Sequence, residues 1–199
     1  MKDSTVPDFN VIPTKEQVLK LAEKYVADAK NQFRKSDDGS AINLWWLEQR
    51  ILGVRAQVQG QGYISTKNRF LEVCYWKTPR SKKHCEKNSE ELIVEVSRIA
   101  FSSKLEEVRI KSWMMLQGVQ WPTASVFLHL FHRDQYPILD VRALEALGSK
   151  RPAAYTLEFW NSYVSYMRNL AKSLNLDMRT LDRGLWQWSA DRAKEGKPE

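Results

Sequence analysis

The spacing of apolar residues along the chain predicts a protein made mostly of helices. A first stripe at the three- and four-residue spacing of one helix face follows Thr14 and Gln17, which have the spacing of a capping box. A second helix is predicted over 44–54, and the glycines within 57–62 are expected to break it. A third helix is expected to end near Pro79, because proline disfavours helical backbone in the residue before it.

Helical spacing continues through the second half of the chain. Asn88 and Glu91 match a capping box ahead of another helix, and the C-terminal helices are predicted over 154–190. The strand signal is weak, because the short apolar run 136–139 contains a proline that argues against a central strand. These patterns predict an all-α fold.

The segment 104–148 predicts a helix, a tight glycine turn, a second helix and then a carboxylate at the start of a third helix. Apolar residues at helical spacing lie on both sides of the turn: Leu105, Val108, Met115 and Leu116 before it, and Ala124, Phe127, Leu128 and Phe131 after it. Gly118 suits a turn that needs a positive φ, and Pro122 suits the first turn of a helix, where a missing N–H costs nothing. Asp140 follows Leu116 by 24 positions.

The order Leu116-Gln-Gly-Val-Gln, then Thr123-Ala-Ser, then Asp140 resembles the helix-hairpin-helix DNA glycosylases. These are the relatives of endonuclease III and of the adenine and alkyladenine glycosylases. Their pattern is L-P-G-V-G, then a T-A pair and a catalytic Asp, with the same offset in endonuclease III. The resemblance covers about a quarter of the 199 residues. It implies a single helical domain over 1–199, with two helical lobes around a cleft.

The resemblance makes Asp140 the catalytic residue. Breaking an N-glycosidic bond builds positive charge on the sugar, and a nearby carboxylate stabilises that charge and aligns or deprotonates water. The alternative is structural, because Asp is a favoured helix N-cap and 141–148 is predicted to be helical. The two roles are compatible.

The turn is predicted to hold a DNA phosphate through backbone N–H groups, with one added hydroxyl contact. The residues are Gln117, Gly118, Val119 and Gln120, with the hydroxyl of Thr123. In the family the carbonyls of this turn often hold a monovalent cation, which the resemblance extends to this chain as an option. The alternative is an ordinary turn between two helices.

The most basic stretch of the chain, 76–84, is a second candidate for DNA contacts. Its predicted contact residues are Lys77, Thr78, Arg80, Lys82 and Lys83. Aromatic residues predicted to receive an unstacked base are Trp45, Trp46, Tyr75 and Trp76. The alternatives are a solvated basic loop and tryptophans that pack in the core.

Departures from the family pattern limit which reaction and which cofactors are expected. Pro122 stands where the lyase members carry a lysine. The resemblance therefore points to a monofunctional enzyme without Schiff-base chemistry. The alternative is a lyase that uses another lysine, such as Lys111. With Cys74 and Cys85 as the two cysteines, no iron–sulfur cluster of four thiolates is expected. No metal site and no cofactor are predicted.

Composition agrees with a polyanionic partner. The formal net charge is +7 and the isoelectric point is about 9.4. No apolar run is long enough for a membrane span, no secretory signal is recognised, and two cysteines favour a reducing cytoplasm. A monomer is expected.

The sequence thus predicts a monofunctional DNA glycosylase acting on double-stranded DNA that contains a damaged or modified base. It would flip the base out and hydrolyse its bond to the sugar, in repair or in defence against phages with modified bases. The alternative from another class is a non-catalytic helix-hairpin-helix module that holds DNA for a partner.

Overall fold

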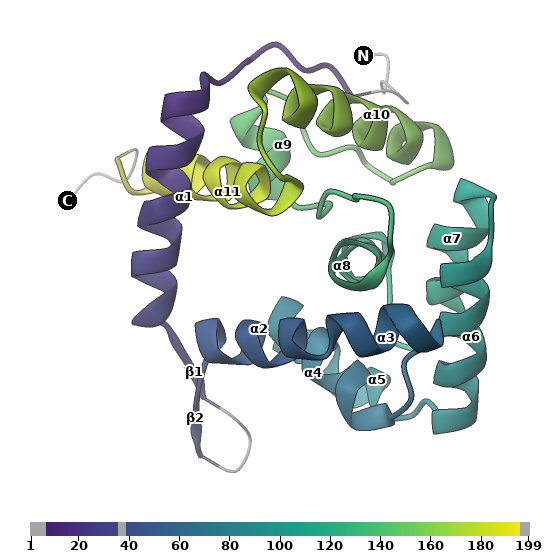
Figure 1. The fold of residues 1–199 in the computed structure, drawn as a ribbon. Coiled ribbons are helices and arrows are strands. Elements are labelled where there is room, and N and C mark those ends of the chain that lie inside the picture. Colours follow the sequence, from purple (N-terminus) through teal and green to yellow (C-terminus); the bar gives the residue numbers. More distant parts are fainter. Residues whose placement is uncertain (1–6, 36–38, 196–199) are drawn as a thin grey trace. The chain divides into compact units, whose positions relative to one another are not determined.

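The computed structural model describes residues 7–35 and 39–195, and most of them are helical (Figure 1). The helices are α1 (Lys15–Lys30), α2 (Leu44–Gly53), α3 (Arg55–Gln61), α4 (Lys67–Lys77), α5 (Lys82–Cys85), α6 (Glu90–Ser102), α7 (Glu106–Ser112), α8 (Trp121–Phe131), α9 (Val141–Ala146), α10 (Leu157–Leu174) and α11 (Met178–Glu195). Two 3-10 turns, η1 (Pro79–Ser81) and η2 (Trp113–Met115), and two strands, β1 (Phe33–Lys35) and β2 (Ala41–Asn43), are also present. The predicted all-α class is confirmed. Among the described residues, no helix is both long and apolar enough to cross a membrane.

The chain divides into two compact units. Unit 1 combines residues 1–28 with 136–199, and unit 2 is the continuous stretch 29–135. Unit 1 therefore contains the two ends of the described chain, and unit 2 contains its middle part. The prediction of a single glycosylase-like domain stays a prediction.

Unit 2 is built around α8, whose residues Thr123–Phe131 are all buried. The ring of Phe127 stacks on Trp113 with centroids 4.2 Å apart and on Phe70 at 5.4 Å. Helices α3, α4 and α7 all contact α8. The short antiparallel strands β1 and β2 pair with Phe33 opposite Asn43, and the Asn43 side chain caps α2. Helix α8 therefore lies in the core of unit 2, surrounded by the helices that contact it.

Unit 1 contains α9, α10, α11 and the first part of α1. Helix α9 packs on α11, where the Ser189 hydroxyl donates a 2.6 Å hydrogen bond to Glu145. Tyr163 of α10 is fully buried, and its hydroxyl donates to the Ile138 carbonyl at 2.9 Å. Gly184 of α11 lies directly against the backbone of α1.

The structure confirms some local predictions and corrects others. The capping box is confirmed: the Thr14 amide donates to the Gln17 side chain at 3.0 Å, and the Gln17 amide donates to the Thr14 hydroxyl at 3.3 Å. The predicted break at 57–62 is wrong, because α3 covers most of that stretch and ends at Gly62. Helix α11 continues to Glu195, beyond the predicted limit of 190.

The apolar stripe predicted before the turn is confirmed at Leu116, which is buried, and is wrong at Leu105 and Met115, which are 66% and 63% exposed. Leu105 precedes α7 as its N-cap and has extended backbone, so it lies outside the helix. Met115 belongs to the 3-10 turn η2, which follows the end of α7 at Ser112. Spacing that assumes one uninterrupted α-helix therefore assigns the wrong face.

Candidate nucleic-acid interface and carboxylate

A tight turn joins η2 to α8. The Val119 amide donates a 3.1 Å hydrogen bond to the Leu116 carbonyl, and Gly118 has φ 82° at the third position of this turn. A positive φ at that position defines a type II turn, which glycine enters without strain. Pro122 lies in the first turn of α8. The predictions for Gly118 and Pro122 are therefore confirmed.

The turn packs tightly against α5. A Cβ placed on Gly118 would lie 2.7 Å from the Cys85 Sγ, 3.0 Å from the Cys85 amide nitrogen and 3.0 Å from the His84 Cβ. No side chain fits in that space without displacing a neighbour. Glycine is therefore required at position 118 twice, for its backbone angle and for this close approach.

Asn88 binds the turn instead of capping α6. Its Oδ1 accepts from the Gln117 amide at 2.8 Å, and its Nδ2 donates to the Gln117 carbonyl at 3.0 Å and to the Cys85 carbonyl at 2.9 Å. The capping prediction for Asn88 is wrong, because the hydroxyl of Ser89 accepts from the Leu92 amide and caps that helix. The sequence carried a polar residue of the right type, but one position from the true cap.

These contacts decide which predicted amides face outward. The Gln117 and Val119 amides are used inside the protein. The amides of Gly118 and Gln120 donate to no acceptor within residues 7–35 and 39–195. In the first turn of α8, Pro122 has no N–H, and the Thr123 amide donates to the Gln120 carbonyl at 2.9 Å. Thr123 is 5% exposed, so its predicted hydroxyl contact with DNA is not retained.

The predicted basic residues span the end of α4, η1 and α5. Thr78 uses its hydroxyl locally, accepting from the Arg80 amide at 3.4 Å. Lys82 lies 3.8 Å from Glu86, and Lys77 is partly buried. Arg80 and Lys83 are exposed. Because α5 contacts the turn, the structure brings the basic segment and the predicted phosphate-binding turn together.

Both cysteines lie beside this region as buried free thiols. A hydrogen bond from the Cys74 side chain is the main cause that lowers the pKa of Cys85 to about 7. Burial raises the pKa of Cys74 well above its ordinary value. In the described part of the chain, no three His, Cys, Asp or Glu side chains are grouped to hold a metal ion.

The four aromatic residues predicted to receive a base lie on α2 and α4, which pack together. Trp46 is 68% exposed, whereas Tyr75 is buried and its hydroxyl donates to the Lys35 carbonyl at 3.1 Å. The guanidinium of Arg34 lies 5.4 Å from the Tyr75 ring centre and donates to the carbonyls of Tyr75 and Trp76. Trp45 lies under the Lys30 ammonium at 5.7 Å. Of the four, Trp46 is the side chain most available for stacking.

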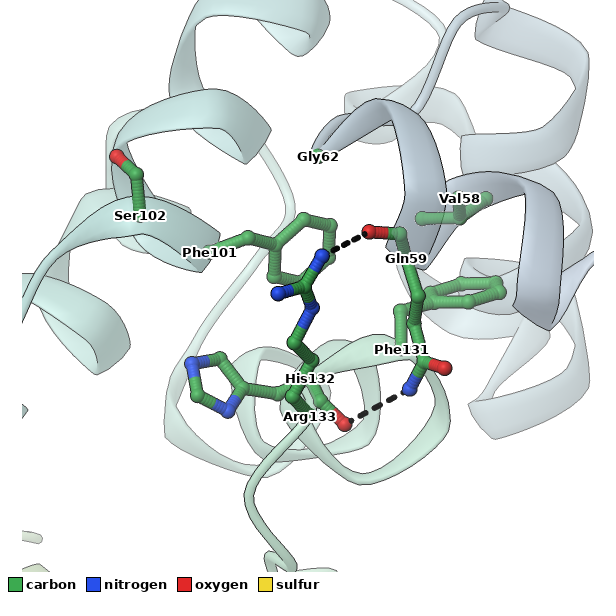
Figure 2. A pocket seen from close by; sticks show the side chains of 8 residues that line it. All are labelled: Val58, Gln59, Gly62, Phe101, Ser102, Phe131, His132 and Arg133. Atoms are coloured by element: carbon green, nitrogen blue, oxygen red, sulfur yellow. Dashed lines mark hydrogen bonds between the residues drawn. The ribbon is translucent and has the colours of Figure 1, made fainter.

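A pocket of about 320 Å³ in unit 2 involves none of these four aromatic residues (Figure 2). Its lining comes from α3 and its C-cap, the end of α6, and the end of α8 with the two residues that follow it: Val58, Gln59, Gly62, Phe101, Ser102, Phe131, His132 and Arg133. The Gln59 side chain donates to the His132 carbonyl at 3.2 Å, and Arg133 donates to the Gln59 carbonyl at 3.1 Å. Burial and the charge of Arg109 lower the pKa of His132. Sequence spacing gave no signal for this pocket, because its three parts are far apart in the chain.

Asp140 belongs to unit 1 and caps α9. Its Oδ1 accepts from the Arg142 amide at 3.0 Å, and its side chain is partly exposed. The structural role weighed for this residue is therefore confirmed. Burial raises the pKa of Tyr155 and, more strongly, that of Tyr163, and the charge of Asp140 contributes to both increases. The negative charge of Asp140 therefore disfavours ionisation of these two tyrosine hydroxyls.

Comparison of the chain with protein-family models, with curated proteins and with solved structures found no match.

Proposed function

We propose that this protein is a monofunctional DNA glycosylase that extrudes a damaged or modified base and hydrolyses its bond to the sugar. The observation that carries the proposal is the type II turn at Gly118, which leads into α8 and packs against the basic segment. Turn amides without an acceptor in the protein attract anions, and neighbouring cations add to that attraction. A DNA phosphate is the partner that this chemistry fits.

Asp140 supplies the carboxylate in this proposal. It begins a helix, is partly exposed and remains a hydrogen-bond acceptor through its capping contact. A fixed carboxylate stabilises the positive charge that develops on the sugar as the base departs. The proposal needs no cofactor.

The direct test is base release. Genomic DNA and DNA from phages with modified bases are incubated with the purified protein, and released bases are identified by mass spectrometry. Release that depends on the protein supports the proposal and names the base. If neither DNA yields a free base while the protein binds both, the enzymatic assignment fails.

A non-catalytic DNA-binding module is the second candidate. It is favoured by the capping bond from the Arg142 amide to Asp140, which accounts for this residue without chemistry. Such a module would bind duplex DNA and release nothing, so the same experiment separates the two candidates.

The product is expected to be an abasic site in an intact strand. Pro122 offers no amine for a Schiff base, and Lys111, the alternative nucleophile, is ion-paired with Glu107. Strand breaks should appear only after alkali or an added endonuclease, and borohydride should trap no covalent adduct. If borohydride traps an adduct with the wild-type protein but not with Lys111→Ala, a lyase mechanism that uses Lys111 would replace the monofunctional proposal.

DNA binding is expected to depend strongly on salt through the basic segment. Removing four cations together, in the variant Lys77→Ala, Arg80→Ala, Lys82→Ala and Lys83→Ala, should reduce the log–log salt slope by up to about 3.6, at about 0.9 per phosphate contact. A matched control removes four exposed cations from unit 1: Lys15, Lys20, Lys172 and Lys194. Titration by fluorescence anisotropy at several salt concentrations measures both slopes. Equal slopes for the two variants would show that the segment does not contact DNA.

A further inference from the structure

Asn88 is 2% exposed, and its side chain makes three hydrogen bonds to main-chain groups. Two of them pair with both the amide and the carbonyl of Gln117, as a neighbouring strand would. The third reaches the Cys85 carbonyl at the end of α5. One buried amide group therefore connects the end of α5 to the turn at Gln117, which is 29 positions from Asn88.

We propose that Asn88 is a positioning residue, which locks the Gly118 turn onto α5 so that the two segments form one preformed surface for the DNA phosphate backbone. This inference rests on the proposed function and deepens it. It assigns to Asn88 a role in recognition that does not require it to touch DNA. It also adds His84, whose exposed side chain starts beside Gly118, as a contact residue of that surface.

The chemistry of the side chain explains why asparagine suits this role. A carboxamide places a donor and an acceptor side by side, which matches the N–H and C=O of a single residue. Aspartate would keep the acceptor for the Gln117 amide but would place a negative oxygen against the carbonyls of Gln117 and Cys85. Alanine would leave these buried main-chain groups without their partner.

Preorganisation is the expected benefit for binding. The amides of Gly118 and Gln120, which have no acceptor among the described residues, can meet a phosphate only if the turn keeps its orientation. The Asn88 bonds restrain the turn on one side, and the close approach of Gly118 to Cys85 restrains it on the other. A surface held in this way loses little conformational entropy when it binds.

The experiment compares Asn88→Ala with Ser89→Ala. Ser89 is the adjacent residue and caps α6, so its substitution disturbs the same helix start without breaking a bond to the turn. Affinity for a 20-base-pair duplex is measured over a range of salt, and amide hydrogen exchange is measured at 117–120 without DNA. His84→Ala is made alone and together with Asn88→Ala. Asn88→Asp is a second variant in case alanine at 88 does not fold.

In Asn88→Ala we expect DNA affinity to fall about tenfold or more, a shallower salt slope and faster exchange of the Gln117 amide. Ser89→Ala should stay within about twofold of wild type in affinity and keep the exchange rates. His84→Ala should weaken binding in the wild-type background and have a smaller effect in Asn88→Ala, because residues that act as one surface are not additive.

Unchanged exchange at 117–120 in a folded Asn88 variant would overturn the positioning role. Equal losses of affinity in the Asn88 and Ser89 variants would overturn it as well. If wild type binds no DNA, both the positioning role and the proposed function fail, even where exchange at the turn increases in the Asn88 variant. If affinity and exchange change as expected but wild type releases no base, the positioning role stands and the enzymatic part of the proposed function fails.

Discussion

Asp140→Asn is expected to reduce base release by about a thousandfold while leaving DNA affinity nearly unchanged. A fixed negative charge at the sugar acts mainly in the transition state, and loss of one such electrostatic contribution costs about 10²–10³ in rate. Asparagine keeps the size of the side chain and caps helices about as well as aspartate, so the contact with the Arg142 amide can persist. Single-turnover measurement of base release, with a thermal melt of the same sample, tests both halves of this expectation.

Asp140→Ala serves as the control for the capping role. It removes the charge and the cap together and should lower the free energy of unfolding by about 1 kcal/mol relative to Asp140→Asn. If Asp140→Asn releases the base at the wild-type rate, the residue is a cap only. A release rate that follows stability across both variants would lead to the same conclusion.

Gly184→Ala is expected to destabilise the protein by about 2 kcal/mol, although alanine is normally the better helix former. The new Cβ would lie 2.7 Å from the Val18 carbonyl oxygen and 2.8 Å from the Val18 Cγ1. The carbonyl belongs to the backbone of α1, so relief requires α1 and α11 to move apart. Chemical denaturation with a shared slope gives the free-energy difference.

Gly60→Ala is the matched control, because Gly60 also lies inside a helix but a Cβ there would meet nothing within 4 Å. This variant should gain up to about 1 kcal/mol from helix propensity. Opposite signs for the two variants would establish that the contact with α1 outweighs propensity at position 184. Stabilisation by both would show that α1 and α11 pack less closely than the structure indicates.

Sequence pattern predicted the helices well where one helix type persists. The helix α8 and the capping box at Thr14 followed from residue spacing alone, although α8 is buried on every face over Thr123–Phe131. Prediction failed at Met115, where the change from α-helix to 3-10 turn shifts which side chains face inward, and at Leu105, which lies before the helix as its N-cap. The strands β1 and β2 were not predicted, because a pairing of three residues leaves no measurable periodicity.

The candidate site was predicted only in part, for a similar reason. Local chemistry was sufficient for Gly118 and for the cap at Asp140, because φ and capping depend on adjacent residues. The role of Asn88 depends on a partner 29 positions away, and single-sequence spacing carries no information on such contacts. The burial of Thr123 likewise depends on how its neighbours pack around α8.

The division of the chain has a consequence for synthesis on the ribosome. All of unit 2 emerges as one continuous stretch, so it can fold as soon as residue 135 is free. The segment up to residue 28 emerges first but belongs with residues from 136 onward. At about 5–20 residues per second, the 64 residues from 136 to 199 take roughly 3–13 s to make. During that interval Val18 of α1 lacks its partner Gly184 on α11, so this part of the apolar face of α1 stays uncovered until the last helix has been made.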